Sequence, residues 1–176
     1  MLDEEARLPV ALESVAFCDE VVVVDSGSTD RSVEIARAAG AVVVENPWPG
    51  FGAQRNVALD HATSDWVLEI DADEHLSPEL QSEIRGFLAA PPANVDIAAL
   101  PLRHHFLGAW LGPSAKYPMY RMRLLRRGAY RHDEDRAVHE GLWPFTPPHP
   151  LAGDLEHELA GTWREALRDT WRYAAL

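Results

Sequence analysis

Two short runs of β-branched residues, separated by a segment of helix length, constrain the fold of this sequence more than any other feature. "EVVVVD" (20–25) and "AVVVEN" (41–46) are nearly continuous apolar runs, which is typical of strands covered on both faces in a parallel sheet. Between them, Thr29 or Asp30 is expected to cap a helix that ends at Gly40. Strand, helix and strand in this order form a βαβ unit, which implies parallel pairing and a right-handed crossover. The sequence therefore predicts an α/β fold.

The α/β pattern continues to about residue 95, and the remainder of the chain is more irregular. The other expected elements are helices over 8–16 and 53–62, a third buried strand over "WVLEI" (66–70), a helix capped by Ser77 with Pro78 at its first position, strand-like segments over 96–103 and 121–127, and a last helix opened by the capping box Thr162-Trp-Arg-Glu165. A length of 176 residues suits one domain. We expect a single domain, 1–176, with an α/β half over 1–95 and a second half over 96–176.

Three carboxylates, Asp71, Asp73 and Glu74, follow the third predicted strand within four positions. Like charges this close resist burial, so a chain that only has to fold gains nothing from them. The carboxyl ends of parallel strands open on one crevice, which also brings Asp25 there. Residues two apart on an extended segment project to the same side, so Asp71 and Asp73 are expected to share a ligand. Carboxylates without nearby cysteine suit Mg²⁺ or Mn²⁺, whose coordination shell substrate phosphates often complete. The alternative is a solvated acidic loop.

The overall charge excludes one class of partner. A formal net charge of −12 argues against a duplex nucleic-acid binder, which needs a basic face against the phosphates. The local exception is a basic stretch made of Arg121, Arg123, Arg126, Arg127 and Arg131. Two interpretations of this stretch stay open: a solvated strand face, and a contact for phosphate or an anionic lipid surface.

Cysteine content and hydropathy indicate a cytoplasmic protein. Cys18 is the only cysteine, so an internal disulfide and a thiolate-rich zinc site are excluded, and a reducing compartment fits best. No apolar run approaches the roughly 20 residues that span a bilayer, and the acidic start "MLDEEARLP" is not a signal peptide. We therefore expect at most a peripheral contact with the inner membrane.

The combination of "VVDSGSTD", "PWPGFGAQRN", "DADE", "VHE" and a late Leu-x-His resembles family 2 glycosyltransferases, above all bacterial glucosyltransferases of the lipopolysaccharide core. The resemblance implies a GT-A-like, three-layer α/β/α sandwich with a mostly parallel sheet. It also implies a metal-dependent, inverting transfer of a sugar from a UDP-sugar to a cell-envelope saccharide or lipid-linked acceptor. Residues 1–95 would then be the nucleotide-sugar-binding half and 96–176 a truncated acceptor-side half.

On the donor side, the resemblance assigns roles to five residues. Asp25 would contact the uracil edge, and Arg55 would face the nucleotide or its phosphates. Asp71 would contact the ribose or metal-bound water, and Asp73 would ligate Mg²⁺ or Mn²⁺. Glu4 falls in the family's Asn-Glu-Glu loop and would line the donor site. A second interpretation of Asp25, as a cap on the following turn, stays open.

On the acceptor side, the "VHE" motif places Glu140 as the candidate general base, with His139 beside it. His139 is equally well interpreted as a hydrogen-bonded loop histidine. His157, in "LEHE", falls where related enzymes have a late metal or phosphate contact. His104 and His105 would make a poor ligand pair, because adjacent residues on a strand point to opposite faces.

The sequence departs from the family at both ends. The family places a strand before its Asn-Glu-Glu loop, and only Met1 and Leu2 precede "DEEARLP" here. We therefore expect the first strand of the sheet to be absent, and the C-terminal region to be shortened. The explanations considered are a mis-assigned start codon, a fragment, and closure of the sheet by a neighbouring chain in an oligomer. These departures leave an alternative function open, namely a truncated, non-catalytic nucleotide-sugar-binding fragment or assembly module.

Overall fold

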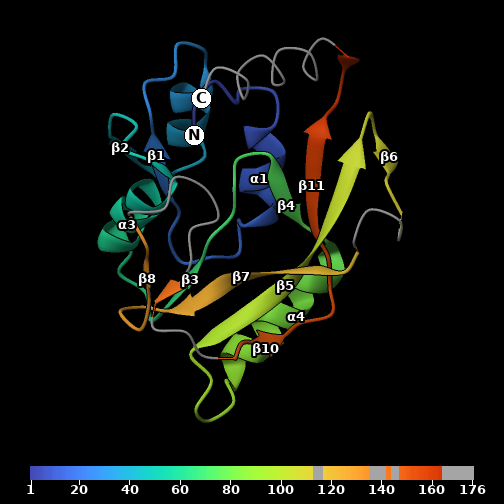
Figure 1. The fold of residues 1–176 in the computed structure, drawn as a ribbon. Coiled ribbons are helices and arrows are strands. Elements are labelled where there is room, and N and C mark those ends of the chain that lie inside the picture. Colours follow the sequence, from blue (N-terminus) through green and yellow to red (C-terminus); the bar gives the residue numbers. More distant parts are fainter. Residues whose placement is uncertain (113–116, 135–141, 144–146, 164–176) are drawn as a thin grey trace.

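The computed structural model describes residues 1–112, 117–134, 142–143 and 147–163 (Figure 1). The described helices are α1 (Leu8–Ser14), α2 (Ser32–Ala38), α3 (Phe51–His61) and α4 (Pro78–Ala89). The described strands are β1 (Val22–Asp25), β2 (Val42–Glu45), β3 (Trp66–Leu68), β4 (Glu74–Leu76), β5 (Ile97–Phe106), β6 (Ala109–Trp110), β7 (Met119–Arg126), β8 (Arg131–His132), β9 (Leu142–Trp143), β10 (His149–Pro150) and β11 (Leu155–Ala160). Most of the predicted last helix lies outside the described residues.

The predicted βαβ unit is present. β1 and β2 pair in parallel, in a register that sets Val22 opposite Val42. α2 connects them and ends before Gly40, whose φ of +83° favours a residue without a side chain. At the start of α2, Asp30 accepts a hydrogen bond of 2.9 Å from the Ser32 N–H. The strand–helix–strand order and the parallel pairing are therefore confirmed.

β2 is an edge strand, and the prediction of a strand buried on both faces is wrong for it. Within the described ranges β1 is its only strand partner, and Val42 is 56% exposed. Only one face is covered, by an apolar cluster that packs on Val43 and contains Leu8, Leu12, Ala36 and Ala41. A continuous β-branched run favours a strand without telling how many of its faces are covered.

The edge of β1 that faces away from β2 carries the first residue of the chain. The Met1 amino group donates to Val24 O at 2.6 Å, and the Ser26 N–H donates to Met1 O at 2.9 Å. Met1 thus flanks Asp25 as a residue of a parallel strand does. Among the described strands, none pairs with β1 on this side.

The larger sheet is mixed, where the sequence predicts a mostly parallel one. Its order is β3-β7-β5-β11-β4, with β6 and β10 attached to β5. β7 runs back along the edge of β5 and pairs antiparallel with it, and β3 pairs antiparallel with β7 on the other side. By contrast, β5 and β11 are parallel. α4 packs on this sheet through Leu80, Ile84 and Phe87 (Figure 1). Ser77 caps α4 by accepting from the Leu80 N–H at 3.1 Å, as predicted.

Two strands that the sequence does not predict, β4 and β11, pair antiparallel with each other. β4 begins inside the acidic segment, at Glu74, and β11 contains the late His157. Their pairing sets His157 opposite Glu74. The two motifs, far apart in the sequence, therefore meet at one place.

α3 docks on β8 through polar residues. The Asn56 side chain accepts from the His132 N–H and donates to its carbonyl oxygen, each at 3.0 Å. A Cβ at Gly52 would collide with the Asp133 carbonyl oxygen, so only glycine allows this approach. The docking fixes the helix that carries Arg55. Within the described ranges, no helix has the length and apolar character to cross a membrane.

Candidate functional site

The acidic segment 71–74 is a closed turn between β3 and β4. The Glu74 N–H donates to the Asp71 carbonyl oxygen at 3.0 Å, and the Asp71 N–H donates to Glu74 Oε2 at 2.9 Å. The expectation that Asp71 and Asp73 project to the same side of an extended segment is therefore wrong. The turn sends their carboxylates into different surroundings.

Asp71 lies between two guanidinium groups. Arg55 Nη2 donates to Asp71 Oδ1 at 2.6 Å, and Arg123 Nη2 donates to Asp71 Oδ2 at 2.7 Å. Arg123 also donates to Glu74 Oε1 at 2.7 Å, and its side chain and that of Glu74 are 9% and 2% exposed. The positive charge that these two carboxylates require is thus supplied by the protein itself.

The pKa values of this network follow from burial and from the arginines. Burial alone would raise the pKa of Asp71, but the charges of Arg123 and Arg55 outweigh it and hold that pKa well below its usual value. Burial raises the pKa of Glu74, and the neighbouring Asp71 adds to the shift while Arg123 opposes it. Burial would lower the pKa of Arg123, yet Asp71 and Glu74 raise it. The guanidinium therefore stays charged.

The network continues away from the turn to β8. Arg55 Nη1 lies 3.9 Å from Glu69 Oε2. On the other side of the same carboxylate, His132 Nε2 lies 2.9 Å from Glu69 Oε1. Both Glu69 and His132 are 8% exposed. His132 directly precedes the segment that leads to the "VHE" motif.

Asp73 faces an imidazole instead of a guanidinium pair. His157 Nε2 lies 3.2 Å from Asp73 Oδ2, and Arg7 Nη1 is farther away, at 3.9 Å. On its other side, His157 Nδ1 lies 3.1 Å from His104 Nδ1. Burial would lower the pKa of His157, but the hydrogen bond to Asp73 and the nearby carboxylates raise it. Burial and the neighbouring His157 lower the pKa of His104.

The donor atoms at Asp73 suit a divalent cation that the substrate helps to hold. Asp73 and His157 offer one oxygen and one nitrogen donor from different elements, side by side. Across the described part of the chain, no group of three His, Cys, Asp or Glu residues is arranged to hold a metal ion. An Mg²⁺ or Mn²⁺ ion bound by this pair would need water and phosphate oxygens, which is the usual arrangement for these ions. The residues present therefore fit the predicted metal.

On the donor side, Asp25 caps the turn that follows it. Its Oδ2 accepts from the N–H groups of Gly27 and Ser28 at 3.0 and 2.9 Å, and Asp25 is 2% exposed. The capping interpretation is thus observed, and the contact to uracil stays a prediction. The Glu4 carboxylate accepts from Arg7 Nε at 2.9 Å.

The charges of several predicted donor-side residues influence the Met1 amino group. Burial lowers the pKa of this group, and the carboxylates of Asp25, Asp71 and Glu4 oppose the shift, while Arg55 adds to it. The pKa of His157 is raised in turn by three carboxylates, those of Asp73, Glu74 and Asp71. The charge of Asp71 therefore influences the pKa values of both Met1 and His157.

His139 and Glu140 lie outside the described residues, so their roles stay predictions. Sequence reasoning gave no separate role to Arg123, which it grouped with the basic stretch. Of that stretch, Arg126 donates to Asp96, Arg127 to the Ser64 carbonyl, and Arg131 pairs with Asp60. These arginines have partners within the chain. The signal for Arg123 was its position in β7 directly before the apolar pair Leu124 and Leu125.

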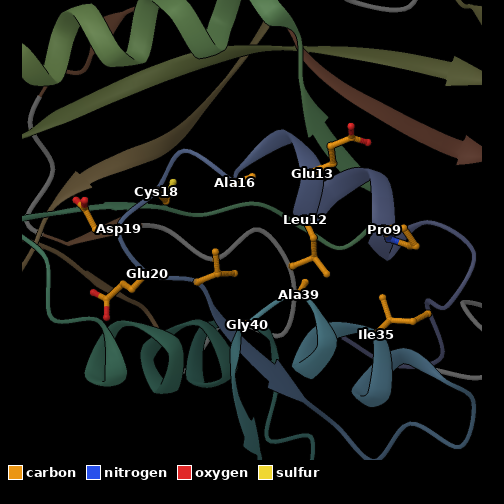
Figure 2. A pocket seen from close by; sticks show the side chains of 11 residues that line it. Pro9, Leu12, Glu13, Ala16, Cys18, Asp19, Glu20, Ile35, Ala39 and Gly40 are labelled. Carbon is orange, nitrogen blue, oxygen red and sulfur yellow. The ribbon is translucent and has the colours of Figure 1, made fainter.

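One hollow in the described structure lies away from the acidic turn. It has a volume of about 510 Å³ and opens between α1, the connection to β1 and the end of α2, as Figure 2 shows. Its lining includes Leu12, Cys18 and Gly40, and none of the predicted site residues lines it. The hollow therefore does not belong to the candidate site.

Known proteins are similar to most of the chain. A family model described as "Glycosyl transferase family 2" matches residues 1–137. The "Lipopolysaccharide core biosynthesis glycosyltransferase LpsC" of Rhizobium meliloti is 35% identical over 148 residues, which are 81% of this chain and 54% of LpsC. The "Uncharacterized glycosyltransferase RT0209" of Rickettsia typhi is 49% identical over 89 residues, 50% of this chain and 30% of that protein. The chain thus spans about half the length of LpsC, and a smaller share of the Rickettsia typhi protein.

Solved structures share the fold. S. aureus TarS 1-349 superposes with a TM-score of 0.57 and 20% identity over 77% of this chain and 49% of that one. Glucosyl-3-phosphoglycerate synthase from Mycobacterium tuberculosis, in complex with Mg²⁺ and UDP, superposes with a TM-score of 0.50 and 24% identity over 72% of this chain and 54% of that one. These likenesses establish an α/β fold of the GT-A type. Because the family model covers most of its length, the chain belongs to glycosyltransferase family 2.

Proposed function

We propose that this chain carries the donor-binding site of a metal-dependent, inverting glycosyltransferase. The donor is a UDP-sugar, and the acceptor is a saccharide or glycolipid of the cell envelope, such as the lipopolysaccharide core. One observation carries the proposal: Asp73 and His157, 84 residues apart in sequence, meet at 3.2 Å beside a turn whose other carboxylates are already neutralised. The likeness to LpsC supports the acceptor class.

In this proposal, Asp73 and His157 hold Mg²⁺ or Mn²⁺, which would supply positive charge to the diphosphate of the donor. Asp71 orients Arg55 at the edge of the same turn, so that the guanidinium faces the departing nucleoside diphosphate. Asp25 and Glu4 line the nucleotide end. The two halves, 1–95 and 96–176, then act as the donor and acceptor sides of one domain.

Glu140 is the proposed general base, with His139 beside it. An inverting transfer requires a carboxylate to take the proton of the acceptor hydroxyl as that oxygen attacks the sugar carbon. The nucleoside diphosphate leaves in the same step, so no covalent enzyme intermediate is formed and no nucleophilic serine or cysteine is needed. We place the reaction in the cytoplasm, because a chain with one cysteine suits a reducing compartment.

Titration calorimetry with UDP tests the proposal. The chain is expected to bind UDP in the presence of Mn²⁺ and to lose most of this binding when EDTA removes the metal or when Asp73→Asn removes a ligand. Asp96→Asn is the matched control, because Asp96 pairs with Arg126 at a half-exposed position away from the turn. Equal UDP affinity with and without metal would overturn the metal role.

A second candidate function, a non-catalytic nucleotide-sugar-binding or assembly module, has one observation in its favour. Among the described residues, β1 is flanked by β2 on one edge and only by Met1 on the other. An incompletely paired edge is able to accept a further strand, from elsewhere in the same polypeptide or from a neighbouring chain. Metal-dependent UDP binding without consumption of a UDP-sugar, together with a dimer in sedimentation, would favour this module over the enzyme.

A further inference from the structure

We propose that His104 is a positioning residue, which orients the imidazole of His157 so that its Nε2 faces Asp73 and the metal. The inference deepens the proposed function and rests on it. His104 itself touches neither the metal nor the substrate in this scheme. Its role is to accept a hydrogen bond from the far side of the His157 ring.

The pair follows from strand register. β5 and β11 are parallel, and His104 stands directly opposite His157 in the ladder. Their Nδ1 atoms lie 3.1 Å apart, while the ring centroids are 5.1 Å apart at an interplanar angle of 54°. A short nitrogen–nitrogen distance between tilted rings indicates a hydrogen bond and not a stacking contact.

The chemistry of a metal-binding histidine fixes the direction of this bond. If His157 Nε2 gives its lone pair to the cation beside Asp73, the proton of the neutral ring must be on Nδ1. Nδ1–H then donates to His104 Nδ1, which accepts only when the His104 proton is on Nε2. Metal-ligating histidines commonly donate their second N–H to such a partner, which holds the ring in place.

The neighbouring histidine provides a matched control. His105 points to the opposite face of β5, where its Nε2 lies 2.6 Å from Glu156 Oε2. It shares with His104 the strand and the residue type. In the described structure it makes no hydrogen bond or ion pair with Asp73 or His157, so its replacement is expected to leave the proposed metal site intact.

The experiment compares Mn²⁺ binding, in the presence of UDP, by the chain and three variants. Free Mn²⁺ is followed by electron paramagnetic resonance, and thermal unfolding without metal is recorded on the same samples. His104→Phe keeps a ring and removes the acceptor nitrogen, and we expect Mn²⁺ affinity to fall about 10-fold to 100-fold. His104→Asn places an amide oxygen near the Nδ1 position and is expected to restore most of the affinity. His105→Phe is expected to bind Mn²⁺ like the unaltered chain.

The outcomes separate this inference from the proposed function. If the unaltered chain binds Mn²⁺, and Asp73→Asn abolishes binding while His104→Phe does not weaken it, the role of His104 is overturned and the metal site stands. Equal losses in His104→Phe and His104→Asn also overturn it, because rescue by an acceptor is its distinguishing mark. If the unaltered chain binds no Mn²⁺ with UDP, both fall. Should His104→Phe fail to fold, His104→Leu takes its place in the same comparison with His104→Asn.

Discussion

Asp71 and Asp73 are two residues apart in the same acidic turn, and the protein treats them in opposite ways. Asp71 has a guanidinium on each carboxylate oxygen, at 2.6 and 2.7 Å. Asp73 has an imidazole at 3.2 Å and the nearest guanidinium at 3.9 Å. The comparison teaches that a cluster of carboxylates need not act as one ligand set, since part of it holds the turn in place while, in the proposed function, the rest binds a cation.

The arginine side of this comparison has a clear energetic consequence. A buried carboxylate is tolerated only when it is paired, and the loss of one partner leaves an uncompensated charge in a poorly hydrated place. Arg123 compensates both Asp71 and Glu74 from one position on β7. The buried members of this network are Arg123 and Glu74, whose side chains are 9% and 2% exposed, whereas those of Asp71 and Asp73 are 46% and 27% exposed. We therefore expect the largest stability effects where Arg123 meets Glu74, and the largest binding effects at Asp73.

The largest stability effect is expected for Arg123→Met. The substitution leaves Asp71 and Glu74 without their shared cation, and we expect the free energy of unfolding in urea to fall by about 3 to 5 kcal/mol. The control is Arg126→Met on the same strand, where the ion pair with Asp96 is about half exposed. It should cost about 1 kcal/mol or less. Equal losses of unfolding free energy in the two variants would mean that the ion pairs of Arg123 contribute no more to stability than a half-exposed pair.

Part of the Arg123→Met loss is expected to be recovered by a second change. Asp71 keeps its ion pair with Arg55 in Arg123→Met, whereas Glu74 loses the Arg123 cation. Glu74→Gln removes that uncompensated charge, so the double variant should regain about 1 to 3 kcal/mol relative to Arg123→Met. In the unaltered background, Glu74→Gln should instead destabilise the chain, because it breaks an existing pair. A double-mutant cycle by urea unfolding measures both signs, and simple additivity would contradict the shared network.

A smaller loss is expected where α3 brings Arg55 to Asp71. Gly52→Ala forces a Cβ against the Asp133 carbonyl oxygen, so we expect a loss of about 1 to 3 kcal/mol. Gly86→Ala is the matched control, because Gly86 lies in α4 with no atom within 4 Å of an added Cβ. That change should stabilise the chain by about 0.5 to 1 kcal/mol. Thermal unfolding would refute this account of α3 docking if both substitutions shifted the midpoint in the same direction.

The smallest effect is a pH dependence of opposite sign on the two sides. The raised pKa of His157 means that its stabilisation is complete below its ordinary value of 6.5 and is lost as pH rises through the folded-state pKa. The lowered pKa of Asp71 means that its stabilisation is present above 3.8 and is lost as pH falls through the folded-state pKa. Without metal, unfolding free energies of the chain and of His157→Gln should therefore converge as pH rises above about 6.5. A constant difference from pH 5 to 9 would contradict this pairing.

The fold was predictable from the sequence where local signals decide it. The βαβ unit follows from "EVVVVD" and "AVVVEN" with Gly40 between them, and the α4 cap follows from Ser77 and Pro78. The mixed sheet was not predictable, because β4 has only three residues and begins with a buried glutamate. What makes β4 a strand is its pairing with β11, which comes about 80 residues later and leaves no local trace.

The candidate site shows the same limit. Asp73 and His157 were found through their motifs, and the structure brings them together. Arg123 was not recognised, since it is one of three arginines in β7 and only the carboxylates that it meets distinguish it. The turn at 71–74 was interpreted as extended, because its closure depends on the Glu74 side chain accepting from the Asp71 N–H.

The division of the acidic turn is tested most directly by measuring Asp71→Asn and Asp73→Asn side by side, for urea stability and for Mn²⁺-dependent binding of UDP. The account predicts that Asp73→Asn loses the metal-dependent binding and unfolds at nearly the same urea concentration as the unaltered chain. Asp71→Asn should show the larger loss of stability, because it leaves two arginines without their shared partner. Unchanged Mn²⁺-dependent UDP binding in Asp73→Asn would contradict the account.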